Sequence, residues 1–124
     1  MRNRLAAALA AGVATAAVAV PLAAAAPHHA GGSVVRISAV GSGLRYDTKA
    51  LRAKAGRITI DFTNLSQLHH DVRLEVGEKE FGGTKTIGHG STSVTVTLKA
   101  GTYHFYCSVP GHEDAGMTGH LIVS

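Results

Sequence analysis

Apolar and polar residues alternate along most of the chain after residue 33, which is the two-residue period of β-strands. The alternation is clearest between residues 58 and 63, where Ile58, Ile60 and Phe62 fall on one face. Glycine-rich turns separate segments of similar character, whereas the stretch 77–90 reads as irregular and polar. The pattern predicts strands, or short extended pieces, at residues 34–40, 44–47, 50–55, 58–63, 71–76, 92–98, 102–107 and 118–123.

Seven or eight short strands at nearly regular spacing, with no helical period between them, predict an all-β domain built as a β-sandwich. The sequence contains no internal repeat, and no shift in composition after the N-terminal stretch indicates a second domain. We therefore expect one domain over residues 34–124, preceded by a flexible N-terminal segment at residues 27–33.

The first 26 residues have the composition of a secretory signal peptide that is removed. Arg2 and Arg4 precede an apolar stretch at residues 5–20, Pro21 ends it, and small alanines follow. No stop-transfer pattern comes after it, so we expect export to a periplasm, cell envelope or extracellular space, without stable membrane insertion. Loss of the two arginines lowers the net charge from +4 to about +2, which gives no basis for nucleic-acid binding.

The chain has one cysteine, Cys107, and it is followed at equal spacing by His112 and Met117. A lone thiol in an oxidising compartment cannot form an internal disulfide, so a metal-bound thiolate explains it better than a leftover free thiol. Cys107 is in phase with Tyr103 and Phe105, two large residues expected in the core. A thiolate, an imidazole and a thioether are ligands of a trigonal copper site with a weak axial methionine, if a second histidine is available.

Two adjacent histidines, His69 and His70, precede the predicted strand at residues 71–76. His70 is in phase with Val72 and Leu74, so we predict that it is the ligand and that His69 is exposed. The alternatives are a metal-free sandwich, a zinc site and a cysteine–histidine nucleophile. The metal-free sandwich needs several coincidences, and structural zinc favours more cysteines than this chain has. A cysteine nucleophile is weak because the thiol is expected to face inward. The predicted metal ligands are therefore His70, Cys107, His112 and Met117.

With these motifs, the chain resembles the cupredoxins, the small blue copper proteins that include plastocyanin, auracyanin and azurin. Residues 101–123 and 64–76 carry the resemblance, through Cys-x4-His-x4-Met and an upstream Asn…His pair. It implies a Greek-key sandwich, one copper ion cycling between Cu²⁺ and Cu⁺, a monomer with transient redox protein partners, and no enzymatic activity. Asp71 stands where relatives usually have asparagine; we expect its amide to reach the Cys107 sulfur and its carboxylate to accept from Ser108.

The sequence thus predicts an exported carrier of single electrons. The alternative is a copper storage or delivery protein, which His28, His29 and His69 would favour. His89 and His104 are expected to face solvent, and the resemblance leaves Tyr106 open as either a docking residue or an ordinary strand residue. An apolar rim around His112 is expected from residues 110–111, 115–116, Leu44 and Leu68.

Overall fold

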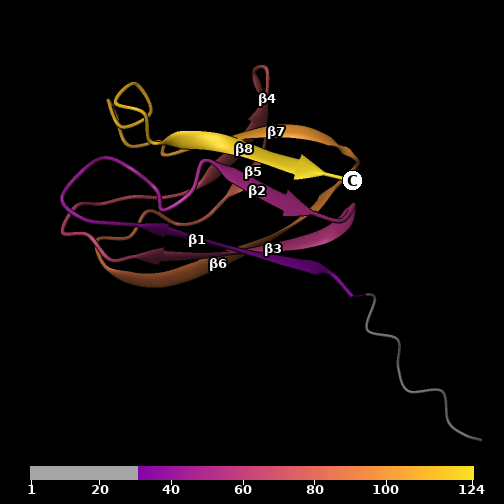
Figure 1. The fold of residues 1–124 in the computed structure, drawn as a ribbon, viewed down its shortest axis with the longest axis horizontal. Helices are drawn as coiled ribbons and strands as arrows, with labels where there is room; N and C mark the ends of the chain where they lie inside the picture. Colours follow the sequence, from indigo (N-terminus) through magenta and orange to yellow (C-terminus); the bar gives the residue numbers. More distant parts are fainter. Residues whose placement is uncertain (1–30) are drawn as a thin grey trace, which may run out of the picture.

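The computed structural model describes residues 31–124, and within this range every regular element is a β-strand (Figure 1). The predicted signal peptide at residues 1–26 lies outside the described residues, as do positions 27–30 of the segment predicted to be flexible. The strands are β1 (Ser33–Ala39), β2 (Ala50–Ala53), β3 (Gly56–Asn64), β4 (Arg73–Val76), β5 (Lys79–Gly83), β6 (Gly90–Leu98), β7 (Gly101–Tyr106) and β8 (Thr118–Val123).

The strands form two sheets that face each other as the layers of a sandwich (Figure 1). One sheet has the order β1-β3-β6 and the other has the order β2-β8-β7-β4-β5. The pairs β1–β3 and β2–β8 are parallel, and the remaining pairs are antiparallel. The predicted all-β Greek-key sandwich is confirmed. Within the described residues, there is no helix that could cross a bilayer.

Alternate residues of each strand fill the space between the sheets, as the sequence pattern predicts. Ile58, Ile60 and Phe62 of β3 are 0%, 1% and 0% exposed, and they face Phe105 and Leu121 from the other sheet, each 0% exposed. β7 and β8 approach closely at Gly119, where a Cβ atom would lie 2.3 Å from the Phe105 ring. The absence of a side chain at Gly119 leaves room for this ring.

The sequence interpretation differs from the structure in three details. The stretch predicted to be irregular contains β5, a polar strand that pairs with β4 across a register shift between Leu74 and Glu75. The piece predicted at residues 44–47 makes only an isolated bridge, between Ala39 and Tyr46. The strand predicted to begin at Asp71 begins at Arg73, which leaves Asp71 in the connection beside His70.

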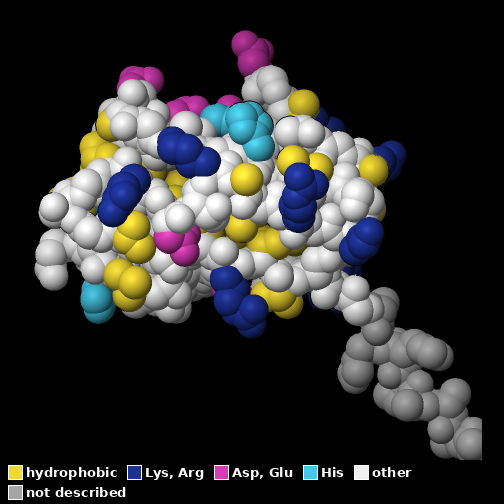
Figure 2. Space-filling view, in the orientation of Figure 1, with side chains coloured by type: hydrophobic (Ala, Val, Ile, Leu, Met, Phe, Trp, Pro, Cys, Tyr) yellow, Lys and Arg dark blue, Asp and Glu magenta, His cyan; other side chains and the backbone are white. Residues whose placement is uncertain are grey.

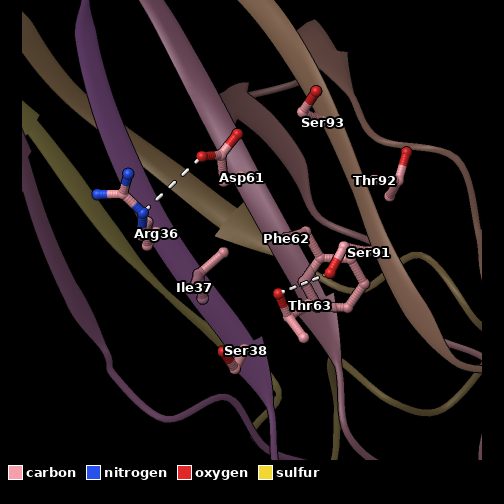
Figure 3. Close-up of a pocket in the computed structure, with 9 residues that line it drawn as sticks. All are labelled: Arg36, Ile37, Ser38, Asp61, Phe62, Thr63, Ser91, Thr92 and Ser93. Atoms are coloured by element: carbon pink, nitrogen blue, oxygen red, sulfur yellow. Dashed lines mark hydrogen bonds and ion pairs between the residues drawn. The ribbon is translucent and has the colours of Figure 1, made fainter.

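A shallow hollow lies over β1, β3 and β6 (Figure 3). Hydroxyl groups dominate it: Thr63 and Ser91 are hydrogen bonded at 3.0 Å, and Arg36 pairs with Asp61 at 3.9 Å. The four predicted metal ligands are absent from its lining. The chemistry of the protein therefore has to be sought at the loops that join the strands.

Candidate metal centre

The predicted ligands come from two connections at one end of the sandwich. Cys107 directly follows β7, and Met117 directly precedes β8. The pairing of these strands continues past their ends, where the amide of Cys107 donates to the Met117 carbonyl at 3.1 Å. Within the loop, the amide of Met117 donates to the His112 carbonyl at 3.0 Å. The loop between them is a run of turns that carries His112 back over Cys107. His70 arrives from the connection between β3 and β4.

Three of the four predicted residues converge with their ligand atoms facing one another. The Cys107 Sγ atom lies 3.8 Å from His70 Nδ1 and 3.5 Å from His112 Nδ1, and the two Nδ1 atoms are 3.1 Å apart. His70, Cys107 and Met117 are 0%, 1% and 0% exposed, whereas His112 is half-buried. The structure thus brings two imidazoles and a thiol together, with one imidazole at the surface.

The protonation states of this cluster suit a metal ion. Burial raises the pKa of the Cys107 thiol, although the amides of Asp71 and Val109 act in the opposite direction. Burial, with His112 nearby, lowers the pKa of His70, so that its imidazole is neutral at pH 7 and free to ligate. Without a cation the thiol stays protonated, and a bound metal would hold it as thiolate.

Asp71 joins the two ligand loops. Its Oδ1 accepts a hydrogen bond from the Ser108 amide at 2.7 Å, and its Oδ2 accepts from the Ser108 hydroxyl at 2.5 Å and from Thr86 at 2.8 Å. Burial alone would raise the pKa of Asp71, but these hydrogen bonds and the nearby Arg73 lower it below its usual value. The expected contact between Asp71 and Ser108 is confirmed, and a carboxylate ionised at pH 7 lies beside the cluster.

The loop before His70 is fixed by Asn64, which is 0% exposed. Its Nδ2 donates to the carbonyls of Leu68 and Ile87, both at 2.7 Å, and its Oδ1 accepts from the amide and hydroxyl of Ser66 at 2.9 and 2.8 Å. His70 and Ile87 exchange two backbone hydrogen bonds of 3.1 and 2.9 Å. One buried amide side chain therefore sets the path of the chain into the cluster.

Tyr46 and Thr86 support the site and were not found from the sequence. The Tyr46 hydroxyl donates to the Asp71 carbonyl at 2.5 Å, and its ring packs edge-on against Phe62 and Phe105. The signal available for Tyr46 was a tyrosine in an extended piece that lacks strand alternation. When such a ring is buried, its hydroxyl needs a polar partner. Thr86 lies in the polar stretch between β5 and β6, where its role depends on tertiary structure.

Of the remaining histidines, His69 and His89 are exposed as predicted, and His104 differs from its prediction. His69, His89 and His120 are exposed, and His28 and His29 lie outside the described residues. His104, which was expected to face solvent, is half-buried, and its Nε2 lies 2.8 Å from Glu113. On the expected apolar rim, Leu68 is 42% exposed, and Leu65 beside it is 58% exposed.

Two imidazoles, a thiol and a thioether make a donor set that is soft enough for copper, and an all-strand sandwich holds it. Fold and donors together define a cupredoxin. The chain belongs to the plastocyanin/azurin family of copper-binding proteins, because residues 33–124 match the model of that family. Its cofactor is therefore one copper ion.

Known structures agree with this family. The dithionite-reduced auracyanin of the photosynthetic bacterium Roseiflexus castenholzii is 27% identical over 74% of this chain and 97% of its own, with a TM-score of 0.70. Auracyanin A of Chloroflexus aurantiacus, a blue copper protein, is 24% identical over 76% and 100%, with a TM-score of 0.66. An azurin of Methylomonas sp. strain J is 21% identical over 74% and 98%, with a TM-score of 0.62. The last two show the fold alone. No curated protein sequence matches the chain.

Proposed function

We propose that the protein is an exported type 1 copper protein that carries single electrons between transient redox partners. In this proposal residues 1–26 are a signal peptide, and residues 34–124 act as a monomeric electron carrier and not as an enzyme. His70, Cys107 and His112 hold the copper, and Met117 is the weak axial ligand. Bound copper supplies a one-electron couple between Cu²⁺ and Cu⁺.

The observation that supports this function most is the convergence of His70, Cys107 and His112 on a rigid scaffold. Their ligand atoms already lie within 4.8 Å of one another, and hydrogen bonds through Asp71 and Asn64 fix the loops that carry them. A scaffold that barely moves keeps reorganisation small when the charge of the metal changes. The half-buried His112 offers a path for the electron to the surface, while the other donors are shielded from solvent.

Reversible redox cycling tests the proposed function. Copper-loaded protein should show an intense visible band from thiolate-to-copper charge transfer, which disappears on reduction and returns fully on reoxidation. The bound copper should stay in place when the protein is mixed with an excess of a competing chelator. A copper storage or delivery protein would instead give up its copper readily, because its ligands would need to open. Colourless protein that loses copper to the chelator within minutes would contradict the electron-carrier proposal.

Replacing Asp71 with asparagine should raise the reduction potential of the copper by roughly 50–100 mV, equivalent to about 1–2 kcal/mol for one electron. The carboxylate favours the more positive oxidised metal, and it is buried, so solvent screens it little. Asparagine keeps the shape and the acceptor for the Ser108 amide. Potentiometric titration of both proteins measures the shift. Asp61→Asn, on the outer face of β3, is a matched control that should leave the potential within about 10 mV, since exposed distant charges are screened.

A further inference from the structure

A second group of ligating side chains lies on the outer face of the five-stranded sheet. Glu75 of β4, His104 of β7 and His120 of β8 are register partners, so they form one row across three adjacent strands. Glu113 reaches the same row from the loop between Cys107 and Met117. Figure 2 shows histidine side chains beside acidic ones on the side of the molecule where β8 lies (Figure 1).

The donors in this row are close enough to share one ion. One ligand atom each from Glu75, His104 and Glu113 lies within 4.8 Å of the other two. The His104 Nε2 atom is 2.8 Å from a carboxylate oxygen of Glu113, and the rings of His104 and His120 have their centroids 5.6 Å apart. Glu75 and His104 are half-buried, whereas Glu113 and His120 are exposed, so an ion could enter from solvent.

Neighbouring groups hold the central imidazole in place. The Tyr106 ring stacks on His104 with an interplanar angle of 14°, and the Thr118 hydroxyl lies 3.0 Å from its Nε2. A ligand whose orientation is already fixed loses less entropy when it binds a metal. Glu75 and Glu80 lie close enough to raise the pKa of Tyr106 beyond the effect of burial, whereas Arg73, which pairs with Glu80 at 2.9 Å, acts in the opposite direction.

We propose that Glu75, His104 and Glu113, with His120 beside them, form a second metal site that binds a divalent late first-row transition ion such as Zn²⁺. One or two imidazoles with two carboxylates are a donor set that zinc accepts, and copper binds such sites more tightly still. The set has no sulfur donor, so it differs in chemistry from the buried cluster. Glu113 follows His112 directly, so an ion at this site ties the copper-ligand loop to the sheet.

The alternative is that Glu113 and His104 form only an ion pair. Such a pair needs a protonated imidazole and leaves Glu75 with no part in the contact. An exposed ion pair of this kind contributes little to stability and gives no reason to expect specific metal binding. Metal binding uses both carboxylates and the neutral imidazole together, so the two interpretations give different results in a zinc titration.

The test is calorimetric titration of Zn²⁺ into protein that carries Cys107→Ser, which removes the sulfur donor of the buried cluster. Adding His104→Gln removes a ligand and should weaken the affinity of this site for zinc by about 100-fold. Loss of a group that only supports a ligand costs roughly 10- to 100-fold, so loss of the ligand itself should cost at least as much. Adding His89→Gln is the control, since His89 is an exposed histidine outside the row, and it should leave zinc binding unchanged. In the wild-type protein, the ring signals of His104 and His120 in NMR spectra should shift on zinc addition.

Two results would overturn the proposal. One is a zinc affinity that His104→Gln changes by less than about twofold, the scatter expected between titrations. The other is a set of His104 ring signals that stays unmoved at saturating zinc. The visible band of copper-loaded His104→Gln protein is a separate readout, and it should match the wild type. Failure of the zinc site therefore leaves the electron-carrier proposal intact, and the reverse also holds.

Discussion

Copper-loaded protein with Cys107 replaced by serine will lack the intense visible absorption of the wild type. The band requires charge transfer from a thiolate sulfur to Cu²⁺, and a serine hydroxyl is a hard donor that stays protonated at neutral pH. Cys107 is the single cysteine of the sequence, and its sulfur lies 3.5–3.8 Å from both candidate imidazoles, so no other thiolate can replace it in the trigonal plane. Absorption and electron paramagnetic resonance spectra of the two proteins, measured at equal copper content, give the comparison.

Met117→Leu is the informative companion to this variant. Leucine conserves the volume of a side chain that is fully buried, so the fold should tolerate it at a cost below about 1.5 kcal/mol. A weak axial ligand contributes little to the band, which should persist at a shifted wavelength with a changed reduction potential. A Cys107→Ser protein that retained the wild-type band would disprove the ligand assignment on which the proposed function depends.

Replacing Asn64 with alanine should lower the free energy of unfolding by about 2–5 kcal/mol, because buried partners that lose a hydrogen bond cost about 1–3 kcal/mol each. Asn64 satisfies the carbonyls of Leu68 and Ile87 as well as the amide and hydroxyl of Ser66. Alanine removes all four hydrogen bonds in a place that water reaches poorly. The Ile87 carbonyl keeps the His70 amide and the Leu68 carbonyl keeps the Ser66 hydroxyl, whereas the Ser66 amide loses its partner. Urea denaturation of the metal-free protein measures the loss without a contribution from copper binding.

Gln67→Ala is the matched control for Asn64→Ala, since Gln67 is an exposed amide in the same loop. It should change the free energy of unfolding by no more than about 0.5 kcal/mol. Asn64→Asp keeps the acceptor but places a carboxylate oxygen against the carbonyls of Leu68 and Ile87, so it should be at least as destabilising as alanine. A loss below about 0.5 kcal/mol in Asn64→Ala would show that the loop is held by other contacts.

The alternation of apolar residues was sufficient to predict the fold class and most strands, because the core of a sandwich imposes a period of two on each strand. The same argument correctly placed His70 in the interior and His69 in solvent. It failed at β5, an edge strand with exposed residues at Lys79 and Glu80, where the core imposes no pattern. Edge strands are defined by their hydrogen-bonded neighbour, which the local sequence does not show.

In the candidate site too, some residues could be predicted from the sequence and others could not. Cys107, His112 and Met117 were predictable because one loop carries them at fixed spacing, and soft donors of this kind have few other uses. Tyr46 and Thr86 were not predictable, because each contacts Asp71 from a segment distant in sequence. The row of Glu75, His104 and His120 depends on strand register, which follows from pairing partners and not from any one strand.

The position of β8 in the chain limits when the protein can acquire its metal. It lies inside its sheet, between β2 and β7, although it is formed by residues 118–123. A ribosome that has made the chain only as far as Tyr106 has produced neither Met117 nor the strand that completes this sheet. A nascent polypeptide of that length therefore has no assembled pocket, and copper can bind there only after β8 has been synthesised.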